Sequence, residues 1–193
     1  MSPAAVLGAD DADRLVLDAA DALFYERGIS GVGMAEIRTV SGVSLRRIYL
    51  LYPSKRDLVA AWLTDRHDRW MRWFKGTVDR RIARGSDPVL ATFDALREWT
   101  KSPDYRGCAF INALAEASEV DTEHRAIVED HKRSLIRHLA ALATQTRSRH
   151  PAWFAEAIAV LIDGAIVQSA VFGTDKPIIA AKKAAARLLE TMP

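Results

Sequence analysis

The 193-residue sequence has little of what several common protein classes need. Its single cysteine, Cys108, excludes a disulfide within one chain and a cysteine-based metal cluster, and we expect a reducing cytoplasm. The first 13 residues are acidic and lack an apolar core, so we expect no signal peptide. The most apolar stretch, 157–173, is shorter than the about 20 uncharged residues that a membrane span requires, so we interpret it as a buried helix and expect no membrane contact. The formal net charge of +2 is too small to indicate a nucleic-acid partner, and only its distribution along the chain is informative.

Strand-like alternation is also scarce. No alternation of apolar and polar residues lasts more than a few positions, whereas apolar residues recur at helical spacing nearly everywhere. The spacing predicts an all-α chain of about nine helices. The expected elements are a first helix closed by Gly28, then 34–40, 44–50, 54–84 with a capping box at Ser54-x-x-Asp57, a fifth helix opened by Asp87-Pro88 with Asp87 as its cap, 104–118, 123–147, 151–172 and 176–191.

Charge is segregated within the first 57 residues. Residues 1–32 hold six acidic and two basic side chains, whereas residues 33–57 hold five basic and two acidic ones. The basic side chains fall on the two short helices predicted at 34–40 and 44–50 and on their C-terminal flank. Two short helices joined by a glycine-containing turn, here Ser41-Gly42-Val43, are typical of a helix-turn-helix, whose second helix enters the major groove of DNA.

The second short helix carries side chains suited to this role. Arg46 and Arg47 can pair with a guanine edge or a phosphate, and Tyr49 offers a hydroxyl on the same helix. Ser44 brings a hydroxyl and a helix N-terminus to a phosphate, and Lys55 lies at the start of the next helix. The alternative is an ordinary helical hairpin whose basic face is simply solvated. In either case the small core between the two helices is expected to contain Ile37, Val40, Val43 and Ile48.

Residues 14–62 also resemble a known family. The pattern comprises Ala19-Ala20-x-x-Leu23-Phe24-x-x-x-Gly28, then Ile37-x-x-x-Ser41-Gly42-Val43-Ser44, then Ile48-Tyr49-x-x-Tyr52-Pro53-Ser54-Lys55-x-x-Leu58-Val59. In spacing and residue type it resembles the N-terminal DNA-binding domain of the tetracycline-repressor (TetR) family. Further along, the stretch 106–116 resembles a sixth-helix pattern seen in many TetR-like regulators.

The resemblance implies a helix-turn-helix DNA-binding domain at 1–62 and a divergent effector-binding and dimerisation domain at 63–193. It also implies a ligand-responsive transcriptional regulator that binds a palindromic double-stranded DNA operator as a homodimer and is usually released by a small-molecule effector. The DNA contacts that it implies are Ser44, Leu45, Arg46, Arg47, Tyr49 and Lys55 and, on the first helix of the motif, Met34 and Thr39.

The chain departs from the family pattern at two places. Gly33 and Met34 stand where the family usually has Thr or Ser, which removes a hydroxyl that caps the helix and contacts phosphate. Arg38 stands where alanine is usual, so its long side chain must extend outward from a packed position.

Aromatic and polar residues of the C-terminal part are candidates for an effector site. Ligand pockets are mostly apolar with a few polar groups. We expect Trp70 and Phe110 to line such a pocket, with Asn112 and Glu116, which are i,i+4 neighbours, at its polar end. The alternative is that the aromatic residues pack in the core and the polar pair makes structural hydrogen bonds or is exposed.

The last two expected helices are candidates for subunit contact. The helix at 151–172 is apolar on most sides, and the helix at 176–191 adds an apolar stripe, so together they are expected to form half of an intersubunit four-helix bundle. The predicted interface residues are Trp153, Ile158, Ile162, Ile166, Ile178 and Leu188.

Motifs for catalysis and metal binding are lacking. His124, His131 and His138 recur every seven residues, which places successive rings about 10 Å apart along a helix, too far to share one ion. Cys108 is expected to be a buried thiol. The sequence has no nucleophile–base pair at motif spacing and no phosphate-binding glycine loop, so we expect no cofactor, no metal and no enzymatic activity. A small helical enzyme and a helical-bundle interaction module are the alternatives to a DNA-binding protein.

Overall fold

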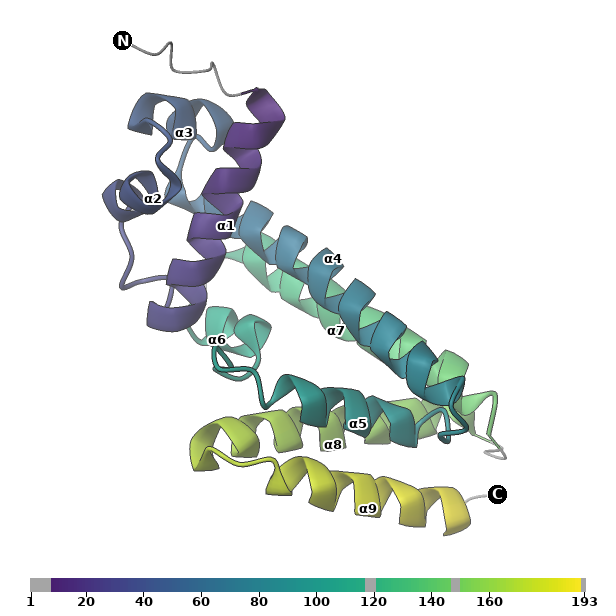
Figure 1. The fold of residues 1–193 in the computed structure, drawn as a ribbon. Helices are drawn as coiled ribbons and strands as arrows, with labels where there is room; N and C mark the ends of the chain where they lie inside the picture. Colours follow the sequence, from purple (N-terminus) through teal and green to yellow (C-terminus); the bar gives the residue numbers. More distant parts are fainter. Residues whose placement is uncertain (1–7, 117–120, 147–149, 192–193) are drawn as a thin grey trace. The chain divides into compact units, whose positions relative to one another are not determined.

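The structure is a computed structural model that describes residues 8–116, 121–146 and 150–191. Within these ranges the chain forms nine α-helices and no strand, which confirms the all-α prediction (Figure 1). The helices are α1 (Ala9–Arg27), α2 (Met34–Ser41), α3 (Leu45–Leu51), α4 (Lys55–Ile82), α5 (Leu90–Trp99), α6 (Ala109–Glu116), α7 (Thr122–Ala143), α8 (Pro151–Phe172) and α9 (Lys176–Thr191).

Side-chain caps predicted from the sequence precede two of the helices. Asp57 accepts the backbone N–H of Ser54 at 2.8 Å, and Ser54 Oγ accepts that of Asp57 at 3.2 Å, which is a reciprocal capping box at the start of α4. Before α5, Asp87 accepts the backbone N–H groups of Val89 and Leu90 at 2.9 and 3.0 Å. Both caps are therefore confirmed.

The predicted limits of the sixth and seventh helices are wrong in part. α6 begins at Ala109 rather than at residue 104, because Tyr105 N–H donates to the Ser102 carbonyl at 3.0 Å in a turn that contains Pro103. α7 ends at Ala143, and the residues that follow form tighter turns. The predicted ends at residues 118 and 147 lie outside the described residues.

The chain divides into two compact units. The first comprises the described residues up to 66 together with 112–127; it holds α1, α2 and α3 entire and parts of α4, α6 and α7. In its core, Phe24 packs edge-on against Trp62, with ring centroids 5.3 Å apart. Other large apolar side chains buried there are Val16, Ile37, Ile48, Leu58 and Leu63. The functional boundary expected at residue 62 stays a prediction.

The second unit comprises the described residues of 67–111 and of 128–193. In it α8 lies beside α9, and α5 packs against α9 (Figure 1). The large apolar side chains of its core include Phe74, Phe93, Leu96, Leu139, Phe154, Ile158, Ile162 and Ile178.

α8 is only partly the buried helix that the sequence predicts. Among the described helices, only α8 is long and apolar enough to cross a membrane. The core helix of a globular protein can have the same length and composition. The most apolar window of α8 has a mean hydropathy of 1.7, and 44% of that window is buried. One face lies in the core of the second unit, whereas Val160 and Val171 on the other face are 73% and 71% exposed.

Four predicted interface residues lie in the core of the second unit instead. Ile158, Ile162, Ile166 and Ile178 are 0–3% exposed within a single chain, because α8 and α9 turn these side chains toward their own unit. Their assignment to a subunit interface is therefore wrong. Trp153 is 49% exposed, so it could still meet a partner.

Candidate nucleic-acid interface

The link between α2 and α3 is a tight turn that depends on Gly42. Its φ of 69° lies in the left-handed region that favours glycine, and its N–H closes α2 on the carbonyl of Arg38 at 3.0 Å. Ser44 then caps α3, since its Oγ accepts the N–H of Arg47 at 3.4 Å. α2, the turn and α3 form the helix-turn-helix that the sequence predicts.

The small core of this motif contains three of the four predicted residues. Ile37, Val43 and Ile48 are 0–2% exposed. Val40 is 55% exposed, so its assignment to the core is wrong. The inner face of α2 is formed by Ile37 and Ser41, one turn apart, and Val40 lies beside that face.

Glu36 supplies one half of a capping box at the start of α2. Gly33 has no side chain to cap the helix, and Glu36 Oε2 accepts its backbone N–H at 3.0 Å. The same carboxylate pairs with Arg27 at 2.8 Å. The Gly33 amide and then Arg27 hold the pKa of Glu36 below its ordinary value. The Gly33 amide is thus already bonded, and Met34 beside it is half-buried.

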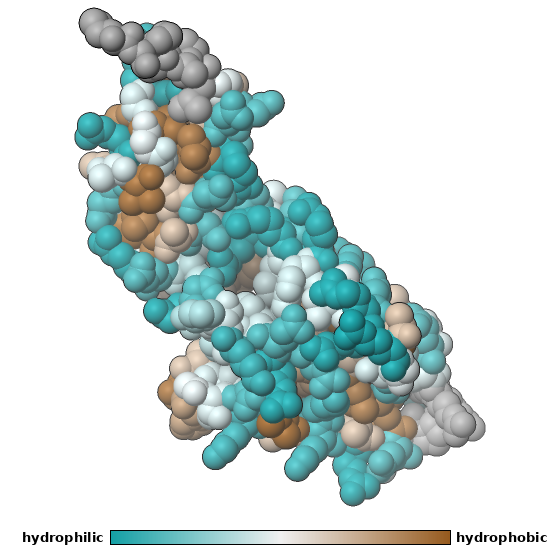
Figure 2. All heavy atoms as spheres, in the orientation of Figure 1, coloured by the Kyte–Doolittle hydropathy of each residue, from teal (hydrophilic) through white to brown (hydrophobic). Residues whose placement is uncertain are grey.

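The outer face of α3 combines basic and apolar surface. Arg46 is exposed and has no hydrogen-bond or ion-pair partner among the described residues. Tyr49 and Leu50 are 47% and 75% exposed, and Figure 2 shows apolar surface over α2 and α3. Sequence reasoning missed Leu50, because nothing in the local pattern distinguishes it from the buried Ile48 two positions earlier.

Arg47, unlike its neighbour, is bonded within the unit. It is half-buried, and its guanidinium donates to the carbonyl of Gly8, immediately before α1, at 2.8 Å. Arg46 therefore presents its charge to solvent, while Arg47 ties the start of α1 to α3.

The remaining predicted DNA contacts surround α3. Thr39 is exposed on α2, Leu45 is half-buried at the start of α3, and Lys55 is the first residue of α4. Tyr52 is 7% exposed and its hydroxyl binds Asp13. Burial, followed by this hydrogen bond, raises the pKa of Tyr52. Tyr52 therefore packs with its hydroxyl at the edge, as the sequence suggests.

Two of the acidic side chains of α1 are paired with arginines of the same unit. Arg14 contacts Asp18 at 2.6 Å and Asp65 at 2.8 Å. Arg66 contacts Asp21 at 2.5 Å. The arginines that pair with Asp18 and Asp21 are thus not those of α3.

Two of the predicted effector-site residues lie together in the second unit. The Phe110 ring stacks on His131 with centroids 3.6 Å apart, and Trp70 meets His131 edge-on at 5.4 Å. Burial lowers the pKa of His131 to about 3, and its Nδ1 lies 3.0 Å from Nδ1 of His67. The indole N–H of Trp70 is buried and has no partner among the described residues.

Asn112 and Glu116, the other two predicted effector-site residues, belong to the first unit. Asn112 is exposed, and Glu116, in the first unit, accepts the N–H groups of Ile29 and Ser30 at 3.1 and 2.7 Å. Partial burial opposes ionisation, but the two amides prevail and hold the pKa of Glu116 below its ordinary value. The contacts of Glu116 favour the alternative of a structural hydrogen bond, and the assignment of Asn112 and Glu116 to a ligand pocket stays a prediction.

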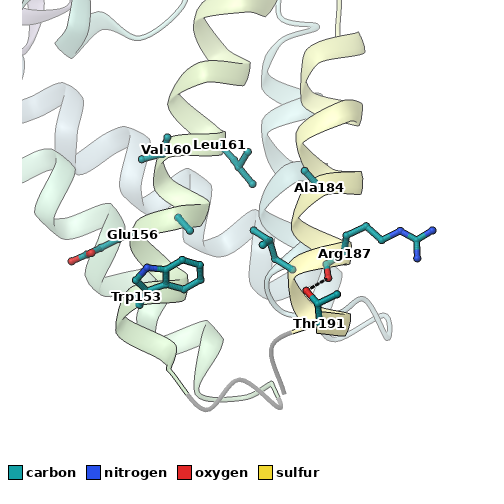
Figure 3. Close-up of a pocket in the computed structure, with 9 residues that line it drawn as sticks. Trp153, Glu156, Val160, Leu161, Ala184, Arg187 and Thr191 are labelled. Atoms are coloured by element: carbon teal, nitrogen blue, oxygen red, sulfur yellow. Dashed lines mark hydrogen bonds between the residues drawn. The ribbon is translucent and has the colours of Figure 1, made fainter.

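The surface between α8 and α9 is hollowed and apolar. Figure 3 shows this hollow of about 660 Å³. Its lining includes Trp153, Val160 and Leu161 on α8 and Ala184 and Leu188 on α9. An adjoining hollow of about 310 Å³ shares Val160, Leu161 and Ala184 with it. Exposed apolar side chains therefore follow the outer side of this helix pair.

The three heptad-spaced histidines have separate surroundings. His124 lies in the first unit, and His131 and His138 lie in the second. In the part of the chain that the structure describes, no group of three or more His, Cys, Asp or Glu is placed to hold a metal ion. Cys108 is buried, as expected.

Known proteins share both the motif and the fold. Residues 16–62 match the sequence profile of bacterial regulatory proteins of the tetR family. A TetR-family transcriptional regulator from Streptomyces coelicolor is 26% identical, with a TM-score of 0.79 over 95% of this chain and 96% of that one. A TetR transcriptional regulator from Chloroflexus aurantiacus, 19% identical, shares the fold with a TM-score of 0.78 over 95% and 96% of the two chains. An uncharacterized HTH-type transcriptional regulator from Lactococcus lactis subsp. lactis is 25% identical over 136 residues, 66% of this chain and 67% of that protein.

The helix-turn-helix, with the exposed Arg46 on its second helix, is the kind of motif that binds DNA, and the similar proteins are transcriptional regulators. The match at residues 16–62 and the fold shared over nearly the whole chain make this protein similar to regulators of the TetR family.

Proposed function

We propose that this protein is a ligand-responsive repressor that binds a palindromic operator as a homodimer and releases it when a small-molecule effector binds. The observation that carries the DNA-binding part is Arg46, which is exposed early in α3 and has no partner among the described residues. The N-terminal residues of a recognition helix are the ones that meet base edges. An arginine bidentate to guanine is worth about 1–3 kcal/mol of base discrimination.

The other proposed contacts follow from the same placement of α3. Ser44 and Lys55 bind phosphate, and Tyr49 reaches the groove beside Arg46. The exposed Leu50 can meet a thymine methyl group, the apolar feature of the major groove. The contacts retained from the sequence analysis are Ser44, Leu45, Arg46, Arg47, Tyr49, Lys55, Thr39 and Met34.

Homodimerisation is proposed to use the apolar outer side of α8 and α9. A helix-turn-helix dimer must hold its two recognition helices about 34–36 Å apart. The exposed apolar residues of α8 support the assignment of the interface to this surface. In a twofold dimer the same residues of both subunits would take part in the contact. They are Trp153, Val160, Val167, Val171 and Phe172.

The effector is proposed to bind near Phe110, Trp70 and His131. The aromatic surfaces suit an apolar or mixed-polarity compound, and the unpartnered indole N–H of Trp70 suits a hydrogen-bond acceptor on it. α6 begins in the second unit and ends in the first, and α7 begins in the first and ends in the second, so both helices connect the unit of the proposed effector site to the unit of the helix-turn-helix.

A repressor of this kind must reach the chromosome, so we propose that the protein is cytoplasmic and not attached to a membrane. A helical enzyme and a plain interaction module remain the competing functions. Neither predicts tight binding to a particular DNA duplex.

A gel-shift titration of genomic fragments selected by this protein tests the proposal. We expect a preferred duplex whose affinity falls steeply with salt, because each neutralised phosphate contributes about 0.9 to the slope of log affinity against log salt. Binding that is weak and equal for all duplexes would favour the interaction module or the enzyme.

A further inference from the structure

His124, in the first turn of α7, has an oxygen atom opposite each ring nitrogen. Nδ1 lies 2.6 Å from the carboxylate of Asp121, and Nε2 lies 3.0 Å from the backbone carbonyl oxygen of Arg56 in the first turn of α4. His124 is 8% exposed. All three residues belong to the first unit.

Both oxygen atoms are acceptors. The Arg56 carbonyl has no proton to give. Asp121 already accepts the backbone N–H of His124 at 3.2 Å and the Arg56 guanidinium at 3.4 Å, as an ionised carboxylate does. A neutral imidazole carries one N–H and can satisfy only one of these oxygens, whereas the imidazolium satisfies both. Two acceptors, one opposite each ring nitrogen, are the surroundings that suit a doubly protonated ring.

This ring joins the start of α7 to the start of α4. The Arg56 side chain makes a second link, because it contacts Asp121 and Glu123 at 3.4 Å each. Arg56 directly follows Lys55, the residue proposed to bind phosphate. Of these links, the one through His124 uses a side chain that ordinarily changes charge near neutral pH.

The geometry points to His124 as a positioning residue that makes operator binding depend on pH. The protonated ring holds the first turn of α4, and with it Lys55, in place for DNA. When the ring loses its Nε2 proton, a nitrogen lone pair faces the Arg56 carbonyl and this link opens, so affinity falls as pH rises. The charged groups around the ring are Asp121 immediately before α7, Glu123 in the first turn of α7 and Arg56 of α4.

This inference rests on the proposed DNA binding, and a pair of variants tests it. The amide of His124→Gln can donate to the Arg56 carbonyl at every pH and has no proton to lose. The probe is a duplex that the wild-type protein selects from random DNA at about pH 6, where histidine is mostly charged. Between about pH 6 and pH 8.5 we expect wild-type affinity to fall about tenfold, the worth of one charge-assisted hydrogen bond, and that of His124→Gln to change less than about twofold.

His150→Gln is the matched control, because His150 is exposed and lies in the second unit. It should keep the wild-type response. A His124→Gln protein that keeps the full wild-type pH dependence would overturn the inference.

Nitrogen NMR of the DNA-free protein gives a separate readout. At about pH 6 both ring nitrogens of His124 should carry protons, and a neutral ring in the folded protein would contradict the inference. Failure of the wild-type protein to select any duplex would instead refute the proposed function, and the NMR result would still decide the state of the ring.

Discussion

Glu116, the last residue of α6, accepts the backbone N–H of Ser30 at 2.7 Å in the loop that follows α1. The same carboxylate accepts the N–H of Ile29 at 3.1 Å. The loop leads into α2, so one carboxylate fixes the approach to the helix-turn-helix. Gly28 lies close as well: a Cβ added there would stand 2.9 Å from Glu116 Oε1.

We expect Glu116→Gln to destabilise the protein at neutral pH by about 1 kcal/mol, a value reduced for the exposure of the carboxylate, or about 2–4 °C in Tm. Because the folded-state pKa lies below the ordinary value of 4.5, the stabilisation is complete above that value and is lost as pH falls through the lowered one. Thermal melts of wild type and variant should therefore converge in acid. Glu129→Gln, at an exposed residue of α7, is the control, and equal Tm values at pH 7 would contradict this role of Glu116.

Gly28→Ala should also destabilise the protein, by about 1–2 kcal/mol, because Gly28 has a φ of 81° and its added Cβ would crowd Glu116. The comparison is Gly76→Ala inside α4, where the nearest atom to an added Cβ is the end of Arg80 at 3.6 Å. That change should raise stability by about 0.5–1 kcal/mol. Urea titrations that give both variants the same sign would show that backbone conformation is not the cause.

Val160→Glu should yield a folded monomer with little operator affinity. Val160 is 73% exposed and lines both hollows of the α8–α9 surface, so in a dimer the carboxylate would be buried against apolar groups at a cost of several kcal/mol. Sedimentation measures the state of assembly. Ala141→Glu, on an exposed position of α7, should stay dimeric. Ile166→Glu would not test the interface, because Ile166 is 3% exposed within one chain and its replacement would unfold it.

An effector should quench tryptophan fluorescence, because all five tryptophans lie beyond residue 61 and Trp70 borders the proposed site. An inducer must bind the DNA-free conformation more tightly than the DNA-bound one. Its affinity, measured by this quenching, should fall when saturating operator is present. A compound whose affinity is the same with and without operator is not the inducer, and Trp70→Phe should remove much of the signal of a true one.

The sequence could predict the features that depend on neighbouring residues. The capping box at Ser54 and the turn at Gly42 are local, and so is the periodicity that defines the helices. Burial depends instead on which face a distant segment covers. For this reason Val40 was placed in the core although it is exposed, and Ile166 was placed at an interface although its own unit buries it.

Polar contacts between residues far apart in the sequence could not be predicted either. Arg46 and Arg47 are adjacent and chemically identical, and only the position of Gly8 in space separates an exposed arginine from a bonded one. Glu116 binds backbone amides 86 and 87 positions earlier, and no spacing rule connects residues so far apart.

The most direct test of the account is the binding of Arg46→Ala to a selected operator and to a scrambled duplex, each measured across salt. We expect the variant to lose about 1–3 kcal/mol of its preference for the operator while the dimer stays folded, as Arg46 has no described partner to lose. Arg84→Ala, an exposed arginine beyond the end of α4, should bind as the wild type does. An Arg46→Ala protein with unchanged preference and unchanged salt slope would contradict the placement of α3 as the helix that reads DNA.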